Sequence, residues 1–294
     1  MIAMKSIPAF LCLYLALTLS LAAQSPNTFR GEAVELSPSQ QQQVESHSCD
    51  YRTFRFPLAD FRRFLQNEAQ GRAGATSEIY LGADLHWSVE LWENDLRSRD
   101  FIRSQTGARG PVDALRLRPN INYRGQLAGQ PDNWLRWTVA DDFWSGLSVV
   151  NGEKYRMESL GNWLPDEELA DVYILYQAGS RHCVSNLATS CWSPHPPAET
   201  PAEIPLTRQT NDPPQRYLEL AADVDYEFYE DYDFDVVQVE QTIQARINEI
   251  DGVYQNQLNM AVILVYLNIW TTPNDPYSGN KDTLYYNVFY HWLR

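Results

Sequence analysis

The chain has 294 residues and carries 38 acidic against 23 basic side chains, which gives a formal net charge of −15 at pH 7. This charge argues against a nucleic-acid-binding protein, because phosphate contacts depend on clusters of Lys and Arg. Hydrophobic residues at 44% and aromatic residues at 13% are enough for a buried core. The length predicts roughly two domains.

Residues 1–23 predict a secretory signal peptide. Lys5 precedes an apolar run over residues 10–21, and Ser20 and Ala22 are small residues that suit cleavage. A membrane anchor is the competing interpretation, but the run is shorter than the ~20 residues that span a bilayer. We therefore expect a secreted protein, extracellular or periplasmic.

Cysteine use agrees with export but leaves the pairing open. One of the four Cys, Cys12, leaves with the signal peptide. Cys49, Cys183 and Cys191 remain, so one disulfide in an oxidising compartment leaves one thiol over.

Residues 24–193 predict a β-rich domain. Its first part, up to Cys49, is polar and is expected to form a leading arm. From Tyr51 on, short alternating runs are broken by Gly, Pro, Asn and Asp, which is typical of an antiparallel β sandwich or barrel. The predicted runs are residues 53–58, 78–94, 113–118, 120–129, 134–160 and 171–178. A helix is expected only at residues 58–69, where apolar residues have helical spacing.

Aromatic residues of this domain allow two interpretations. A sugar-binding face is one, and cross-strand core pairs are the other and the more common arrangement. The residues concerned are His86, Trp87, Trp134, Trp137 and Trp144.

Residues 194–214 predict an exposed linker, because seven Pro and almost no large apolar residue occur there. Such a segment separates domains and is open to proteolysis, although it contains no dibasic cleavage site.

The stretch from residue 216 to residue 270 predicts a β-α-β unit. A short apolar run at residues 217–222 is followed by a helix at about residues 236–258 and by a continuous apolar run at residues 260–270. We expect the two strands to be parallel with a right-handed crossover. The apolar face of the helix is formed by Val236, Val239, Ile243, Ile247, Ile250 and Tyr254.

Eight carboxylates and no Lys or Arg occur in residues 217–235. Paired carboxylates can serve a glycosidase, but there they lie apart on rigid strands. The simpler interpretation is that Asp233 or Asp235 caps the helix while the others lie on a solvated loop.

Residues 216–270, with RYLEL, INEIDGVY and ILVYLNIWTTPND in this order, resemble the opening of the catalytic domain of reprolysin (ADAM and snake-venom type) zinc metalloproteases. Residues 281–294 resemble the start of that domain's second helix. Residues 122–160 and 171–177 resemble the pro-segment of the same precursors, except that Asn122 stands where the family often has Cys. The resemblance implies an α+β chain: an antiparallel, β-rich pro-domain (24–193), a linker (194–214) and a truncated metzincin-like β-α-β-α unit (215–294).

The metal site of this family is missing from the sequence. Metzincins hold zinc through HExxHxxGxxH, and no such motif occurs here. The chain is then expected to be inactive alone, either a fragment of a longer precursor, which an end within the second helix favours, or a degenerate relative. The alternative function is a secreted, non-enzymatic module that binds a protein or a carbohydrate.

Two residues receive roles from the resemblance. Cys183 is the candidate inhibitory thiol that would bind the catalytic zinc in the latent enzyme, although Val184 replaces the usual Gly after it. A disulfide with Cys191 is the alternative, Cys191 is the other candidate for the thiol, and a bond between Cys49 and Cys191 would leave Cys183 free. Glu219 is the candidate calcium ligand, and a solvent-facing strand position is its alternative. The implied partners are a peptide substrate and an intramolecular contact between the pro-domain and the catalytic domain.

Overall fold

The computed structural model of the protein describes residues 27–48, 50–70, 74–82, 84–112, 115–164, 167–178 and 216–277. The expected signal peptide, the expected linker and all four Cys lie outside these ranges.

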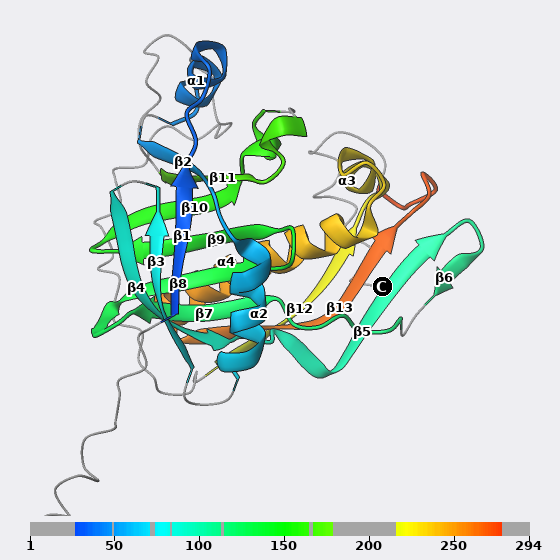
Figure 1. Cartoon of the computed structure of the whole chain (residues 1–294). Helices are drawn as coiled ribbons and strands as arrows, with labels where there is room; N and C mark the ends of the chain where they lie inside the picture. The colour runs from blue at the N-terminus through cyan, green and yellow to red at the C-terminus, as the bar shows by residue number, and fades with distance from the viewer. Residues whose placement is uncertain are drawn as a thin grey trace, which may run out of the picture.

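The larger unit is a closed barrel with the strand order β1-β2-β11-β10-β9-β8-β7-β4-β3 (Figure 1). Its strands are β1 (Asn27–Ala33), β2 (Tyr51–Arg55), β3 (Ala75–Leu81), β4 (Leu85–Glu93), β7 (Asn122–Leu127), β8 (Gln130–Val139), β9 (Trp144–Val150), β10 (Glu153–Ser159) and β11 (Val172–Gln177). Neighbouring strands are antiparallel except β1 and β3, which are parallel. The β-rich, antiparallel character expected from the sequence is thus present.

Four short helical elements accompany the barrel: α1 (Pro38–Glu45), α2 (Leu58–Glu68), η1 (Leu160–Asn162) and η2 (Glu167–Leu169). Helix α2 agrees with the expected helix, whereas α1 lies where we expected only a polar arm. The sequence holds a signal for α1, because Ser37 and Gln40 form a capping box and Pro38 occupies the first turn. In the part of the chain that the structure describes, no helix has the length and apolarity to cross a membrane.

Aromatic side chains fill the barrel. Trp137 and Trp144 are 0% and 1% exposed, and their ring centroids lie 5.3 Å apart. Helix α2 adds Phe61 and Leu65 to this core. Trp134 is also buried, so the sugar-binding interpretation of these Trp residues is wrong. Trp137 and Trp144 face the barrel interior, because alternate residues of a barrel strand point inward. Trp134 lies on the opposite face of β8 and is buried in a separate cluster with Val253 of helix α4.

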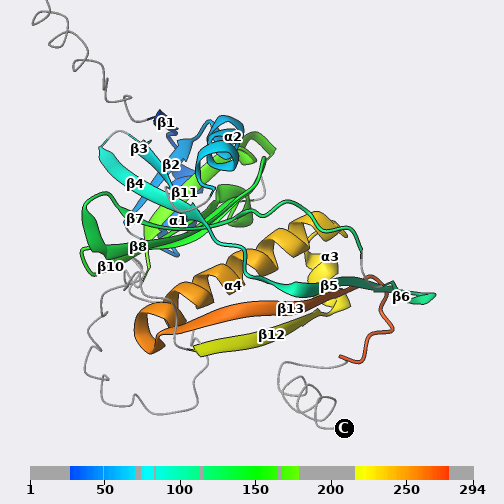
Figure 2. The same ribbon diagram turned by 90° about the horizontal axis from the view of Figure 1, so that it is seen from below.

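The second unit is a sheet with the order β12-β13-β5-β6. Its elements are β12 (Arg216–Val224), β13 (Met260–Trp270), β5 (Arg97–Gly107) and β6 (Gly110–Val112), with helices α3 (Tyr226–Asp231) and α4 (Val236–Leu258). Strands β12 and β13 are parallel and are joined through α4, so the β-α-β prediction is confirmed. Figure 2 shows α4 between this sheet and the barrel.

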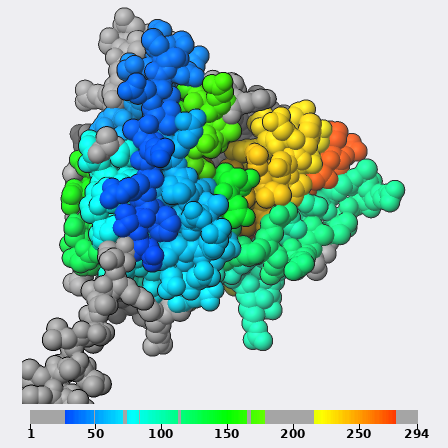
Figure 3. All heavy atoms as spheres, in the orientation of Figure 1, coloured from blue at the N-terminus to red at the C-terminus, as the bar shows by residue number. Residues whose placement is uncertain are grey.

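Strands β5 and β6 were not expected in this sheet. Both belong to the chain between barrel strands β4 and β7, yet β5 pairs in parallel with β13 and antiparallel with β6. In Figure 3 their atoms lie beside those of the C-terminal elements. The prediction of a strand at residues 113–118 is wrong for residues 115–118, the part that the structure describes. These residues form no strand, and Leu117 is exposed. One backbone hydrogen bond, from the Leu115 N–H to the Arg103 carbonyl of β5 at 2.9 Å, connects this segment to the sheet.

Candidate functional site

Helix α4 is the element through which the two units meet. Its start is fixed by Asp235, whose carboxylate accepts hydrogen bonds from the backbone N–H of Val237 at 2.7 Å and of Gln238 at 3.3 Å. Of the two predicted caps, Asp235 is therefore the one confirmed. The helix ends at Asn259, which has the left-handed φ of 50° that stops a helix.

One face of α4 packs on the sheet as expected. Val239 and Ile247 are buried in a cluster with Leu264 and Leu267 of β13. Five of the six predicted apolar positions contact this cluster. The exception is Ile250, which is 42% exposed and was wrongly assigned to the buried face.

The opposite face of α4 is polar and nevertheless buried. Its side chains bond to residues 94–156 of the barrel and its connections: Glu240, Gln244, Asn248, Glu249, Asp251 and Gln255. Buried polar groups require partners because an unpaired one loses its hydration without replacement. This face of α4 is therefore an interface with the barrel and its connections, and not a surface exposed to solvent.

The pair between Arg136 and Asp251 lies at the centre of this interface. Arg136 Nε lies 3.3 Å from Asp251 Oδ2, and both side chains are 0% exposed. Burial lowers the pKa of Arg136, and the charge of Asp251 opposes that effect. Asp251 Oδ1 also accepts from the backbone N–H of Val262 at 3.0 Å. One carboxylate thus connects strand β8, helix α4 and strand β13.

Glu240 closes one end of the interface. Its Oε2 accepts from Arg103 Nε at 2.8 Å and from Arg118 Nε at 3.1 Å. Arg103 lies on β5, so this contact also anchors the added strand. Because the Glu240 side chain is only 2% exposed, water screens these two pairs weakly.

Glu249 adds a further ion pair to the interface. Its Oε2 accepts from Arg156 of β10 at 2.7 Å. Burial raises the pKa of Glu249, although the charges of Arg156 and Arg246 lower it in part. Burial therefore works against the ionised form of this carboxylate, and the two Arg residues compensate for it incompletely.

Amide side chains lie between the ion pairs. Asn248 Nδ2 donates to the backbone oxygen of Trp137 at 3.1 Å, and its Oδ1 accepts from Asn94 at 2.9 Å. Asn122, which stands where the resembling family often has Cys, donates to Gln244 at 3.2 Å and accepts from Thr138 at 2.8 Å. Asn122 thus contributes a hydrogen bond to the contact with α4.

The acidic stretch before α4 forms caps and local contacts. Asp225 caps α3 by accepting from the Phe228 N–H at 2.8 Å, and Asp223 accepts from Trp270 Nε1 at 3.0 Å. The capping interpretation is therefore the one that the structure supports. The expected solvated loop is wrong, because most of the other carboxylates lie on strand β12 and on helix α3.

The comparisons with known proteins concern this region above all. Residues 216–293 match the family described as "Reprolysin (M12B) family zinc metalloprotease". Over 157 residues the chain is 25% identical to snake venom metalloproteinase H5 of Deinagkistrodon acutus, which covers 52% of this chain and 38% of that protein. The C-terminal segment is of reprolysin type.

The chain spans well under half the length of that snake venom relative. Metalloproteinase-II from Bacteroides fragilis is a similar solved structure, with a TM-score of 0.36 and 9% identity over 80% of this chain and 64% of that chain.

The residues present do not fit the zinc of the reprolysin family. The sequence contains no HExxH, and in the described ranges no three His, Cys, Asp or Glu side chains are grouped to hold a metal. Glu219 is exposed on β12, an outer strand, with no such group around it. Cys183 lies outside the described residues, so its role stays a prediction.

Proposed function

We propose that this chain is the N-terminal part of a secreted, zinc-dependent metalloendopeptidase precursor. Residues 1–23 would direct export, residues 24–193 would form the pro-domain, residues 194–214 would be cut on activation, and residues 215–294 would begin the catalytic domain. The observation that supports this most is the docking of the reprolysin-type segment onto the barrel through the buried polar face of α4. The zinc ligands would come from a part of the precursor beyond these residues.

The polar character of the interface suits two units that later separate. Once the linker is cut and the barrel leaves, the face of α4 that carries Glu240, Asn248 and Asp251 can be hydrated. An apolar face of the same size would instead expose a patch that promotes aggregation. The buried ion pairs therefore favour a releasable pro-domain over a permanently joined domain.

Strand β5 supports the same proposal. It covers the edge of β13 by parallel pairing, with Leu267 opposite Arg103 and Ile269 opposite Gln105. An uncovered edge strand exposes backbone donors and acceptors that pair readily with other chains. The pro-domain would protect this edge in the precursor, which is a chaperone-like contribution to its folding.

Cys183 and Glu219 enter the proposal with the roles that the resemblance implies. Cys183 precedes the linker in the sequence and would act as the inhibitory thiol, and Glu219 would contribute to a calcium site. In a precursor that includes the coding sequence downstream of Arg294, Cys183→Ala should raise the peptidase activity of the unprocessed form. Cys191→Ala is measured beside it, and a rise in activity with Cys191→Ala alone would transfer the role to Cys191. Equal latency in the parent and in Cys183→Ala would remove the role from Cys183.

The deciding experiment is to express the precursor from the complete gene. We expect an HExxHxxGxxH motif downstream, about one zinc per molecule, and chelator-sensitive peptide hydrolysis that increases when the 194–214 linker is cut and the barrel is then released. A gene without that motif, or a cleaved product without metal-dependent activity, would contradict the protease and support the binding module.

A further inference from the structure

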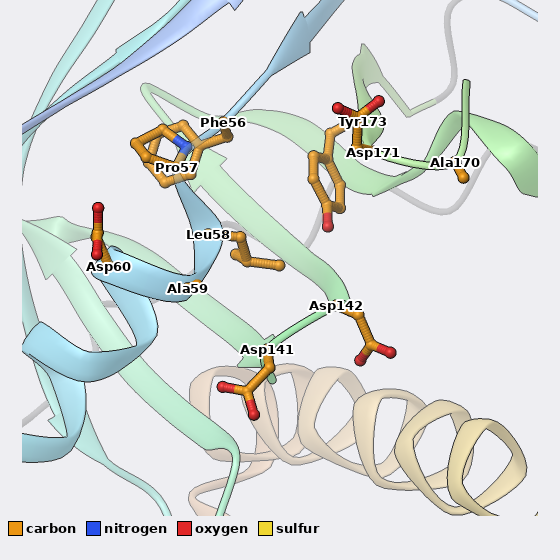
Figure 4. Close-up of a pocket in the computed structure, with 10 residues that line it drawn as sticks. All are labelled: Phe56, Pro57, Leu58, Ala59, Asp60, Asp141, Asp142, Ala170, Asp171 and Tyr173. Carbon is orange, nitrogen blue, oxygen red and sulfur yellow. The ribbon is translucent and has the colours of Figure 1, made fainter. Parts of the chain in front are cut away.

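A cavity of about 470 Å³ lies on the barrel and is lined by barrel residues alone (Figure 4). Three parts of the chain form it: the start of α2, the turn between β8 and β9, and the start of β11. Its lining consists of Phe56, Pro57, Leu58, Ala59, Asp60, Asp141, Asp142, Ala170, Asp171 and Tyr173. The interface with the reprolysin-type segment uses none of these residues.

Four carboxylates surround this cavity, and two of them have a charged partner. Asp60 is bound by Arg63 at 2.9 Å and Asp171 by Arg55 at 3.0 Å. Asp141 and Asp142 are exposed and have no ion-pair or hydrogen-bond partner within the part of the chain that the structure describes. The cavity therefore keeps an excess of negative charge.

Tyr173 supplies an independent sign of a ligand. Its side chain is buried, with the residue only 4% exposed, yet its hydroxyl has no hydrogen-bond partner among the described residues. Figure 4 shows this hydroxyl pointing into the cavity, between Leu58 and Asp142. Burial, followed by the charges of Asp142 and Asp171, raises the pKa of Tyr173, so the phenol stays protonated at neutral pH. The hydroxyl oxygen is not fully enclosed by protein, so it is open to the cavity and can bond to a molecule that occupies it.

The chemistry of the lining limits what that partner is. The acids are not grouped for a metal ion, since no set of three metal-binding side chains converges in the described ranges. An anion would suit the start of α2, where Pro57 provides no side-chain cap, but four carboxylates repel it. Phe56, Leu58 and the ring of Tyr173 form apolar walls, which favour a cation with an apolar, planar body.

We propose that this cavity binds the side chain of an arginine presented by a protein partner. The guanidinium would reach Asp141 and Asp142 and donate to the Tyr173 hydroxyl oxygen, while its methylene stem would lie against Phe56 and Leu58. Arginine is favoured over lysine because its planar group both stacks on aromatic rings and pairs with two carboxylates. The proposal does not depend on the protease assignment.

The test is a calorimetric titration of the 294-residue chain with Nα-acetyl-arginine amide at low salt. Nα-acetyl-citrulline amide is the matched neutral probe, since it keeps the shape and loses the charge. We expect saturable binding of the arginine probe, at least about tenfold weaker binding of the citrulline probe, and weakening by added salt.

Two variants locate the binding. Asp141→Asn/Asp142→Asn changes exposed turn residues and should weaken binding about tenfold, and Tyr173→Phe should weaken it about threefold through the lost hydrogen bond. Asp132→Asn, an exposed acid of the β8 strand outside the cavity, is the control and should have no effect. If Tyr173→Phe fails to fold, which circular dichroism would show, the double Asn variant still decides.

Three results would overturn the proposal. They are the absence of saturable binding at any soluble probe concentration, equal binding of citrulline, and equal weakening by Asp132→Asn. Tighter binding of inorganic phosphate than of the arginine probe would reassign the cavity to the α2 N-terminus and an anion.

Discussion

Gly252 is a residue at which helix α4 lies close against the barrel. A Cβ placed there would lie 2.5 Å from Arg136 Cγ and 2.7 Å from a Trp134 ring carbon. Both neighbours are buried, so neither can move aside easily. The approach of helix to barrel therefore depends on the absence of a side chain.

The sign of the change in unfolding free energy caused by Gly252→Ala tests whether this contact is tight. In an open helix this change stabilises by about 1 kcal/mol, because Ala is the better helix former. Here we expect a loss of about 1–3 kcal/mol from overpacking instead, measured by urea unfolding. Gly161→Ala is the control, since its nearest contact would be Ser159 Oγ at 3.4 Å. Stabilisation by Gly252→Ala would show that α4 is not held against the barrel.

The second prediction at this scale concerns Glu249 and pH. Its pKa is raised from 4.5 by burial, so the folded state favours the protonated carboxyl. A group whose pKa is higher in the folded state than in the unfolded state stabilises the folded protein fully at pH values below its unfolded pKa. This stabilisation is lost as the pH rises through the folded pKa. We therefore expect Glu249→Gln to gain stability relative to the parent chain as pH increases from 4 to 7.

Urea unfolding of both chains at several pH values measures this difference. Asp132→Asn serves as a control for removal of an exposed charge. A variant that instead becomes progressively less stable than the parent toward pH 7 would show that the pair with Arg156 outweighs the cost of burial.

Single residues of the α4 interface were hard to predict for a physical reason. Glu240, Asn248 and Asp251 lie opposite the apolar face of an amphipathic helix, and such a pattern normally indicates solvent on the polar side. The sequence carries no local sign that a second unit covers that face. By contrast the Asp235 cap depends only on neighbouring backbone groups, and this local prediction was confirmed.

At the scale of elements, strand β5 connects the two units. Its residue Phe101 is buried in the cluster between sheet and α4, whereas its neighbour Ile102 is 41% exposed. The alternation follows from the period of a strand, in which successive side chains face opposite sides. The two positions form a matched pair on the same backbone.

We expect Phe101→Ala to destabilise the protein by about 3–5 kcal/mol and Ile102→Ala by far less, because only the first leaves a cavity in a packed cluster. Hydrogen exchange should also increase at the amides of β13, which pairs with β5. Equal effects of the two variants, or unchanged exchange in β13, would contradict the role given to β5.

The elements also show where pattern reading works. The two strands and the long helix α4 of the segment from β12 to β13 were predicted to within two residues, because they differ clearly in apolar periodicity. Helix α3, in the same segment, was missed. Strand β5 was missed because Arg97, Arg99, Asp100 and Arg103 interrupt its alternation. Its partner lies more than 150 residues later, and one of those charges, Arg103, pairs with Glu240 only in the assembled fold.

At the scale of the whole molecule, the barrel and the reprolysin-type segment share one helix as a common surface. The apolar face of α4 belongs to the sheet, and its polar face belongs to the barrel (Figure 2). The barrel also donates β5 to the sheet, so the contact combines main-chain pairing with buried ion pairs. Cutting the linker alone removes neither contribution.

We therefore expect the two parts to remain associated after cleavage within residues 194–214. Size-exclusion chromatography of a chain with a specific protease site inserted there should show co-elution at moderate salt. Asp251→Ala should release the barrel, because it leaves Arg136 buried without its charge partner, a loss of about 3–5 kcal/mol. Asp231→Ala, an exposed acid at the end of α3, should leave the cleaved parts together. Spontaneous separation of the parent chain after cleavage would mean that the linker, and not the α4 interface, holds the two units together.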